Sequence, residues 1–313
     1  MALSAVAAYG GCVPRLYTPG ARVLRWYRRN GRSFPWRGTA DPYAILVSEM
    51  MAQQIQIARV LPAYARFLRR FPSLAALAEA SLGDVLREWS GLGYNRRARD
   101  LHRIARACPD GLPRTVEALD ALPGIGAYTA GAVACFAYGQ PVAFADTNIR
   151  RVLGRVFLGR IATEREAVAL DAAHLPVRAA AAWHQGLMDL GATVCVSRSP
   201  HCERCPFHID CAFVRTASGA EDRTAAPPGN GAGVRRPRLT HASIAAAAKG
   251  EAYAASDRRV RGRIIAALAG APDGLAPSAL ARTIGDDRVP GLIGTLVAEG
   301  LVERHGRRVR LPA

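Results

Sequence analysis

Four of the seven cysteines are confined to one short segment, with the spacing C-x6-C-x2-C-x5-C. Thiolates this close in sequence can wrap one compact metal centre, and such use of cysteine is typical of a reducing compartment. Zinc sites commonly use two close pairs, whereas one close pair flanked by two single cysteines fits a [4Fe–4S] cluster better. We therefore expect a [4Fe–4S] cluster, with zinc or unligated cysteines as alternatives. The expected ligands are Cys195, Cys202, Cys205 and Cys211.

A tight turn containing glycine lies upstream of the cysteines. It reads Leu122-Pro123-Gly124-Ile125-Gly126-Ala127-Tyr128-Thr129, between a predicted helix over 116–122 and an apolar run over 130–137 that predicts a second helix. Backbone N–H groups at such a turn can bind a phosphate closely, at Gly124 and Gly126 above all. The pattern is that of a helix-hairpin-helix, although an ordinary helix connection would also use glycines.

An aspartate follows this hairpin at a fixed spacing. Asp146 lies twenty residues after Gly126 and precedes an arginine-rich segment. This spacing allows the carboxylate to return beside the hairpin. Because DNA phosphates repel a carboxylate, its presence there requires a chemical reason.

The charge of the chain favours a polyanionic partner. The formal net charge is +17, and Lys249 is the only lysine, so the excess is carried by arginine. Nucleic acid is the usual partner of such a surface, and a compositional bias on a solvated surface is the alternative. No apolar run approaches the ~20 residues that span a bilayer. A bacterial cytoplasmic, nucleoid-associated location is expected.

Short amphipathic helices without a strand pattern before residue 300 predict an all-α body. The helix that starts at Pro42 carries Glu49 among Val47, Met50 and Met51. A glutamate in such a setting is seldom tolerated unless it is paired or functional. The alternative is a glutamate at the edge of the helix, facing solvent.

The segment 91–99 is basic, rich in glycine and contains an aromatic residue. Tyr94, Arg96 and Arg97 suit insertion into DNA, and a helix-capping loop with a solvated basic face is the alternative.

The chain divides into four predicted parts. A disordered leader over 1–20 lacks the features of a signal peptide. The all-α body covers 21–215, and a linker rich in Pro, Gly and Ala covers 216–236. The part over 237–313 predicts a winged helix that binds DNA or a partner, with helices at Arg258–Leu268, Pro277–Ile284 and Val289–Glu299 and a hairpin over 301–311.

Several motifs in order make residues 21–215 similar to the endonuclease III superfamily of base-excision glycosylases, and most of all to the MutY-type adenine DNA glycosylases. The matching stretches are Phe34-Pro35-Trp36-Arg37, Asp41-Pro42-Tyr43, 48–54, Gly91-Leu92-Gly93-Tyr94, 122–129, Asp146-Thr147-Asn148, 188–192 and the four cysteines. The resemblance implies a two-lobed all-α fold and double-stranded DNA with a mispair or lesion as the partner. We expect a monomer.

The chemistry of such an enzyme fits two of these residues. Adenine is a poor anionic leaving group, so it must be protonated as its bond to the sugar breaks. An apolar setting favours the protonated form of a carboxylic acid, so Glu49 is the candidate general acid. An ionised carboxylate stabilises the oxocarbenium-like sugar, and Asp146 takes that role. Tyr128 and Asn148 belong to the same site.

The resemblance also assigns residues that contact DNA. Gln54 and Tyr94 match the family's wedge, which fills the gap left when the target base leaves the stack. Gln53, Gly124, Gly126, Arg96 and Arg97 are further DNA-binding candidates. The residues that match the lining of the adenine pocket are Arg32, Trp36, Arg37 and Gln185.

Departures from the family pattern bear on activity and substrate. Bifunctional relatives cut the backbone through a lysine where this chain has Tyr128, so we expect a monofunctional glycosylase that uses water. MutY-type enzymes usually have a Nudix-like domain that recognises 8-oxoguanine, and here a winged helix is predicted instead. Adenine opposite 8-oxoguanine or guanine is the expected substrate; thymine or uracil opposite guanine, or a modified purine, is the alternative. A non-catalytic Fe–S protein that binds DNA is the competing hypothesis.

Overall fold

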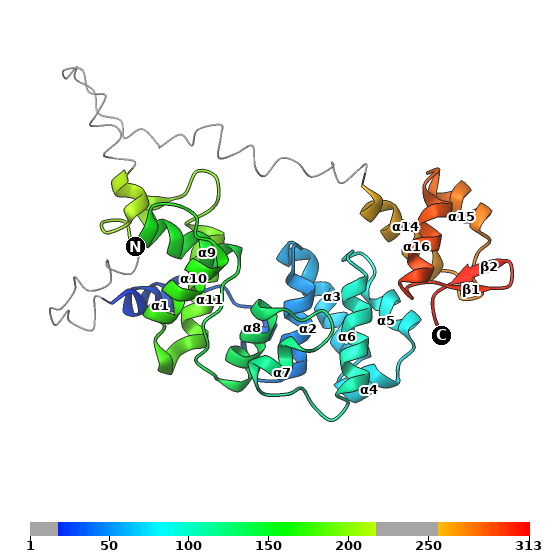
Figure 1. The fold of residues 1–313 in the computed structure, drawn as a ribbon, viewed down its shortest axis with the longest axis horizontal. Helices are drawn as coiled ribbons and strands as arrows, with labels where there is room; N and C mark the ends of the chain where they lie inside the picture. Colours follow the sequence, from blue (N-terminus) through cyan, green and yellow to red (C-terminus); the bar gives the residue numbers. More distant parts are fainter. Residues whose placement is uncertain (1–17, 217–255) are drawn as a thin grey trace, which may run out of the picture. The chain divides into compact units, whose positions relative to one another are not determined.

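The computed structural model describes residues 18–216 and 256–313 (Figure 1). The predicted leader lies outside these residues except at its end, as does the predicted linker except for Thr216. The described residues belong to two compact units, one built from 18–33 and 134–216, the other from 34–133 and 256–313. None of the helices in the described residues is both long and apolar enough to span a membrane.

The regular elements of the first unit are all helices. Its helices α1 (Pro19–Asn30) and α11 (Ala180–Thr193) pack closely at Gly186 of α11. A Cβ at Gly186 would lie 2.7 Å from Cγ1 of Val23 and 3.2 Å from Cβ of Tyr27, so a larger residue would push the two helices apart. Its elements are α1 (Pro19–Asn30), α9 (Thr147–Leu153), η3 (Gly154–Leu158), α10 (Glu164–His174), η4 (Val177–Ala179), α11 (Ala180–Thr193) and η5 (Cys202–Arg204).

A fully buried carboxylate organises the core of this unit. Asp171 of α10 accepts hydrogen bonds from the backbone N–H of Phe144 (3.1 Å), from Nε1 of Trp183 (2.6 Å) and from Nε2 of His184 (2.7 Å). The ring of His184 stacks on Phe144 with centroids 3.9 Å apart. Because every partner is itself buried, this network holds α10, α11 and the segment before α9 together.

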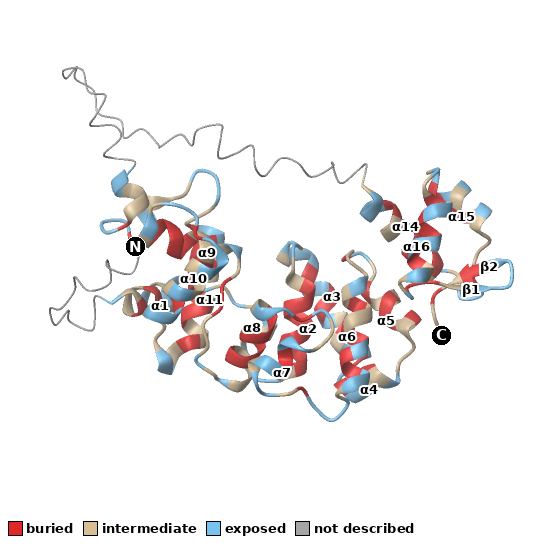
Figure 2. Ribbon diagram, viewed as in Figure 1, coloured by how far each residue is buried: buried red, intermediate tan, exposed pale blue. Residues whose placement is uncertain are grey.

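The second unit is built around α2 (Pro42–Ala52). Every residue of this helix from Tyr43 to Met51 is buried, so α2 is the central helix rather than an amphipathic one (Figure 2). Its Tyr43 hydroxyl donates to the carbonyl of Phe71, 2.9 Å away. The surrounding elements are η2 (Pro35–Arg37), α3 (Ile57–Arg70), α4 (Leu74–Glu79), α5 (Leu82–Trp89), α6 (Arg96–Ala107) and α7 (Val116–Asp120), while α8 (Ala127–Tyr138) crosses the boundary between the units.

The C-terminal part of this unit has three helices and a two-stranded antiparallel hairpin, as predicted. An isolated bridge joins Leu275 to Val309 of the second strand. The all-α prediction is confirmed, since these are the only strands among the described residues. The elements are α14 (Asp257–Ala269), α15 (Pro277–Ile284), α16 (Val289–Ala298), β1 (Glu303–His305) and β2 (Arg308–Arg310).

The C-terminal part packs on α5 and α6 through specific contacts. The N–H of Gly83 donates to the carbonyl of Pro312 at 2.7 Å, and a Cβ at Gly83 would lie 2.6 Å from that oxygen. Glu299, whose side chain is 10% exposed, is the shared acceptor of a cluster that we call the Glu299 cluster. Its oxygens bind Arg96 (2.5 Å) and Arg261 (3.0 Å), and its carbonyl accepts from Arg99 (2.7 Å). One carboxylate thus joins α6 to α14.

Replacement of Asp171 by Ala should lower the free energy of unfolding by about 3–5 kcal/mol, because it leaves buried donors without an acceptor. Chemical denaturation followed by circular dichroism measures this loss. The control is Glu164→Gln on the exposed part of α10, which should change stability by less than about 0.5 kcal/mol. Equal stability of Asp171→Ala and the wild type would contradict the assigned role.

Replacement of Glu299 by Gln should cost about 1–2 kcal/mol of stability. The hydrogen bond from Arg96, assisted by Arg261, lowers the pKa of Glu299 to about 2. The folded-state pKa is therefore below the unfolded value, so this stabilisation is present above about pH 4.5 and is lost as the pH falls toward 2. Thermal unfolding from pH 3 to 7 should show a gap between variant and wild type that narrows in acid. Asp273→Asn, at an exposed position, is the control.

Candidate active site

Glu49 is a buried acid with a hydroxyl donor. Its residue is 9% exposed in the middle of α2, which excludes the alternative of a solvent-facing glutamate. Tyr128, near the start of α8, donates its hydroxyl proton to Oε2 of Glu49 at 3.0 Å. One turn after Glu49, Nε2 of Gln53 donates to Oγ1 of Thr129 at 3.3 Å. Two side-chain contacts therefore hold the C-terminal half of α2 against the first turn of α8.

The predicted hairpin connects α7 and α8. Gly124 has φ +77°, and a Cβ there would lie 2.9 Å from Cβ of Asp100, so both conformation and space require glycine. Gly126 is exposed, with open space where a side chain would be. The second helix begins at Ala127, three residues earlier than the apolar run predicts. Its first N–H groups have no acceptors within the helix and lie beside the exposed glycine turn, which suits an anion.

Asp146 lies in the first unit, where it caps the N-terminus of α9. Oδ1 accepts from the N–H of Ile149 and Oδ2 accepts from Nδ2 of Asn148, both at 2.7 Å. Burial raises the pKa of Asp146, while these donors and the charge of Arg151 oppose that rise. The carboxyl group is therefore held in one orientation by donors that favour its ionised form.

Arg151 connects this acid to the cysteine segment. Nη2 of Arg151 donates to Oδ1 of Asn148 (2.7 Å) and to the carbonyl of Gly191 (2.8 Å), and Nε donates to the carbonyl of Cys195 (2.7 Å). A Cβ at Gly191 would lie 2.6 Å from Cβ of Asn148, so a larger residue would displace Asn148. The sequence analysis did not single out Arg151, although Gly191 lies in one of the matching stretches.

The four residues predicted to line the base pocket fall into the two units. In the first, Asp189 binds the backbone N–H of Arg32 at 2.8 Å and its Nε at 2.7 Å, while Gln185 accepts from the hydroxyl of Tyr27 at 2.6 Å. Asp189 lies in the matching stretch 188–192, where the sequence analysis gave it no role; it is fully buried and holds Arg32 through these hydrogen bonds. The other two share an aromatic partner in the second unit: Trp36 stacks on Phe34 (centroids 5.2 Å apart) and Cζ of Arg37 lies 4.9 Å from the centroid of the Phe34 ring.

Gln54 and Tyr94, the wedge pair, are brought together by the fold. Both have left-handed backbone conformations, with φ +59° and +50°, which residues other than glycine rarely adopt. The Tyr94 hydroxyl donates to Oε1 of Gln54. Strain at two contacting residues of a predicted DNA site is consistent with a functional constraint on both.

Arg97 lies beneath the wedge pair, on the first turn of α6. Its Nη1 donates to the carbonyls of Met50 (2.5 Å) and Gln53 (2.8 Å), and its Cζ lies 4.8 Å from the Tyr94 ring centroid. Burial lowers the pKa of Arg97 to about 10, and Nε and Nη2 have no hydrogen-bond partner among the described residues. Both arginines that were predicted to bind DNA therefore have partners within the protein: Arg97 binds the carbonyls of Met50 and Gln53, and Arg96 belongs to the Glu299 cluster.

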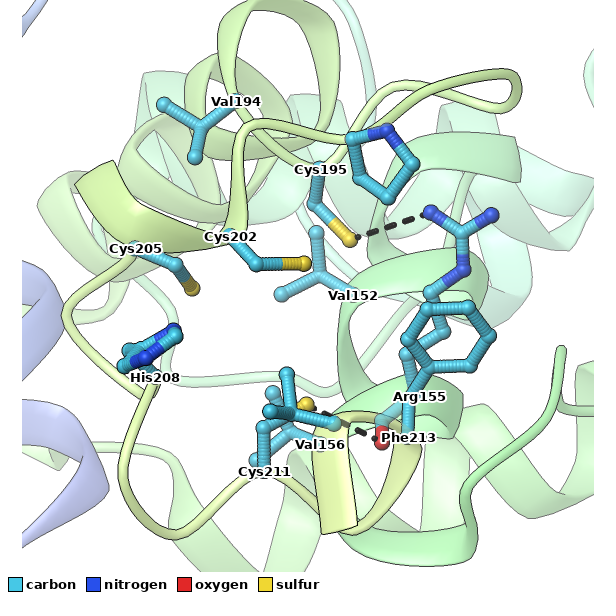
Figure 3. A pocket seen from close by; sticks show the side chains of 12 residues that line it. Val152, Arg155, Val156, Val194, Cys195, Cys202, Cys205, His208, Cys211 and Phe213 are labelled. Carbon is cyan, nitrogen blue, oxygen red and sulfur yellow. Dashed lines mark hydrogen bonds between the residues drawn. The ribbon is translucent and has the colours of Figure 1, made fainter. Parts of the chain in front are cut away.

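The four predicted cysteine ligands line one pocket, with their sulfur atoms facing a common space (Figure 3). Arg155 closes one side: its guanidinium donates to the carbonyls of Val196 (2.7 Å) and Ser197 (3.0 Å), and its Nη1 lies 3.5 Å from Sγ of Cys195. Within 18–216 and 256–313, no three His, Cys, Asp or Glu side chains are placed to hold a single metal ion. Of the other cysteines, Cys135 is buried and Cys108 is half-buried, whereas Cys12 lies outside the described residues.

Comparisons with known proteins agree with this geometry. The family described as HhH-GPD superfamily base excision DNA repair protein matches residues 47–172. The adenine DNA glycosylase of Mycobacterium tuberculosis is 43% identical over 256 residues, covering 79% of this chain and 77% of that protein. That of Mycolicibacterium smegmatis is 40% identical, covering 79% and 78%. A solved thermostable thymine-DNA glycosylase is 29% identical with a TM-score of 0.56, over 63% of this chain and 94% of that one.

The match to the mycobacterial proteins extends over most of both chains, and the predicted acids, hairpin and cysteines all lie in the part of the fold just described. The chain therefore belongs to the adenine DNA glycosylases of the HhH-GPD superfamily.

Proposed function

We propose that this protein hydrolyses the N-glycosidic bond of an adenine mispaired with 8-oxoguanine or guanine in double-stranded DNA. The observation that carries the proposal is the pair of differently held carboxyl groups, Glu49 buried in α2 and Asp146 capping α9. The apolar core around α2 favours the protonated form of Glu49, whereas the Ile149 N–H and the Asn148 amide favour the ionised form of Asp146 against its own burial. Acid catalysis on a glycosidic bond requires one acid in each state. The name shared by the mycobacterial relatives supports adenine as the excised base.

Glu49 protonates the departing base. The Tyr128 hydroxyl, which donates to Oε2, orients this carboxyl group. Asp146 stabilises the positive charge that develops on the sugar, since its two donors orient the carboxylate and cannot neutralise it. Water then adds to the sugar carbon that adenine has left, and the proton that the water loses passes to the Glu49 carboxylate, which restores the acid. Arg151 and Asn148 position Asp146.

Tyr128 occupies the place where bifunctional relatives have a lysine. A phenol that donates to a carboxylate cannot form a Schiff base with the sugar, and Lys249 lies outside the described residues. We therefore propose a monofunctional enzyme that leaves an uncut abasic site.

The cysteine pocket suits a [4Fe–4S] cluster. A tetrahedral zinc ion, with Zn–S bonds of about 2.3 Å, would gather the four sulfurs around one point. A [4Fe–4S] cluster would bind each cysteine through a different iron, which suits four side chains that surround one common space. Held by these four cysteines, a cluster would cross-link the chain from Cys195 to Cys211. Arg151 binds both the Cys195 carbonyl and Oδ1 of Asn148, so a fixed cysteine segment would also hold Asn148 in place.

Three features support DNA as the partner: the net charge of +17, the exposed hairpin with the N-terminus of α8, and the wedge pair. Backbone N–H groups of the hairpin suit a phosphate, and Gln54 with Tyr94 suits the gap left by a flipped base. We propose that one copy of the chain binds one mispair, and that the enzyme acts at the bacterial nucleoid.

Replacement of Glu49 by Gln should slow base release by about 10³-fold, and replacement of Asp146 by Asn by about 10²–10³-fold, because each removes one charge or proton from the transition state. Single-turnover assays on labelled duplexes containing A opposite 8-oxoguanine, A·G, T·G and U·G measure this, with alkali added to reveal abasic sites. Binding of the A·8-oxoguanine duplex should change less than tenfold.

Glu79→Gln and Asp110→Asn, at exposed positions, are the matched controls and should keep wild-type rates. Release of thymine or uracil without release of adenine would overturn the proposed substrate. Strand cleavage by the wild type without alkali would overturn the monofunctional assignment.

Replacement of Cys202 by Ser should reduce the iron bound by the anaerobically reconstituted protein and its absorbance near 400 nm. Iron and sulfide analysis and the visible spectrum measure the change, and Cys108→Ser, outside the pocket, should match the wild type. About one zinc per chain and no sulfide in the wild type would contradict a cluster.

A further inference from the structure

The helix α14 reaches the wedge pair from the C-terminal part of the chain. Nη1 of Arg258, an exposed residue in the first turn of α14, donates to the Tyr94 hydroxyl. The Cζ atom of Arg258 lies 4.7 Å from the centroid of the Tyr94 ring, so the cation also faces the π system. Residues 164 positions apart are thus in direct contact at the predicted site of DNA insertion.

The Glu299 cluster fixes this approach. Arg261 follows Arg258 by three residues and so lies one turn along α14, where it binds Glu299. The same carboxylate binds Arg96, two residues after Tyr94. Because α14 and the start of α6 share this one acceptor, Arg258 and Tyr94 are held at a defined separation.

The hydrogen bonds around Tyr94 have only one possible direction. A guanidinium can donate and cannot accept, so the Tyr94 oxygen accepts from Arg258 and its own proton goes to Gln54. The atom of Gln54 that receives this proton must be Oε1. The amide NH2 of Gln54 consequently lies on the side away from Tyr94, on an exposed residue.

We propose that Arg258 is a positioning residue for substrate recognition: through Tyr94 it fixes the amide of Gln54 so that the wedge offers N–H donors to DNA. The chemistry recognised is a hydrogen-bond acceptor on the edge of the base pair that the wedge opens. The C-terminal part thereby takes part in recognition although its effect passes through two side chains of the body. This inference rests on the proposed function, in which Gln54 and Tyr94 enter the duplex.

A double-mutant cycle tests the chain of hydrogen bonds. Arg258→Met removes the donor, Tyr94→Phe removes the hydroxyl, and the double variant removes both. Single-turnover adenine release from A·8-oxoguanine should fall about 5- to 10-fold in each single variant and no further in the double variant, because both break the same chain. Arg258→Lys keeps a donor and should restore most of the rate, while Arg263→Met, at an exposed position on the same helix, should match the wild type.

Two further measurements separate this role from others. Fluorescence of 2-aminopurine next to the target adenine, measured in the Glu49→Gln background, should show less base opening in Arg258→Met, and this readout does not depend on catalysis. The slope of log Kd against log salt should be the same for Arg258→Met and the wild type.

Other outcomes overturn the proposal. If Arg258 instead contacts a DNA phosphate, Arg258→Met should reduce the magnitude of the slope of log Kd against log salt by about one. Its loss of rate should then add to that of Tyr94→Phe in the double variant. Equal base opening with and without Arg258 would also refute the positioning role. If the wild type binds and opens the duplex but releases no base, the proposed function is wrong. The double-mutant cycle can then be measured by 2-aminopurine fluorescence in place of base release, and it still decides the role of Arg258.

Discussion

A carboxyl group can be buried only where the chain supplies donors for it, and this requirement explains much of the structure. Asp171 of α10 binds α11 and the segment before α9, and Asp189 binds Arg32. Glu49 and Asp146 meet the same requirement with donors that include the Tyr128 phenol for Glu49 and the Asn148 amide and Ile149 N–H for Asp146. The acids that organise the core and the two acids of the proposed catalytic site are therefore buried by the same means.

Arginine has an equally structural role, despite the charge that points to DNA. Arg97, Arg151 and Arg155 direct their guanidinium groups at backbone carbonyls, beneath the wedge or around the cysteine segment. A planar group with five donors can satisfy several carbonyls at once, which lysine cannot do. The near absence of lysine thus agrees with a chain that uses its cations to connect loops as well as to attract a polyanion.

The sequence predicted the helical class, the central helix with its buried glutamate, the hairpin and the C-terminal helices, because each depends on local periodicity or on glycine and proline at fixed positions. It did not predict the roles of Arg151 and Asp189, each of which contacts residues distant in sequence, nor that Arg97 would point inward. The contact between Arg258 and Tyr94 also could not be predicted, since it depends on how α14 packs against α6. Such contacts are a property of packing and leave no pattern in a single sequence.

The left-handed backbone at Gln54 and Tyr94 has a consequence for attempts to make this protein more robust. Glycine would relieve the strain at either position at little conformational expense in the folded state. A selection for heat resistance alone would therefore favour glycine at the two places where the proposed function requires side chains that enter the duplex. Thermostability and recognition of damaged DNA would then be in direct conflict within a few ångströms of each other.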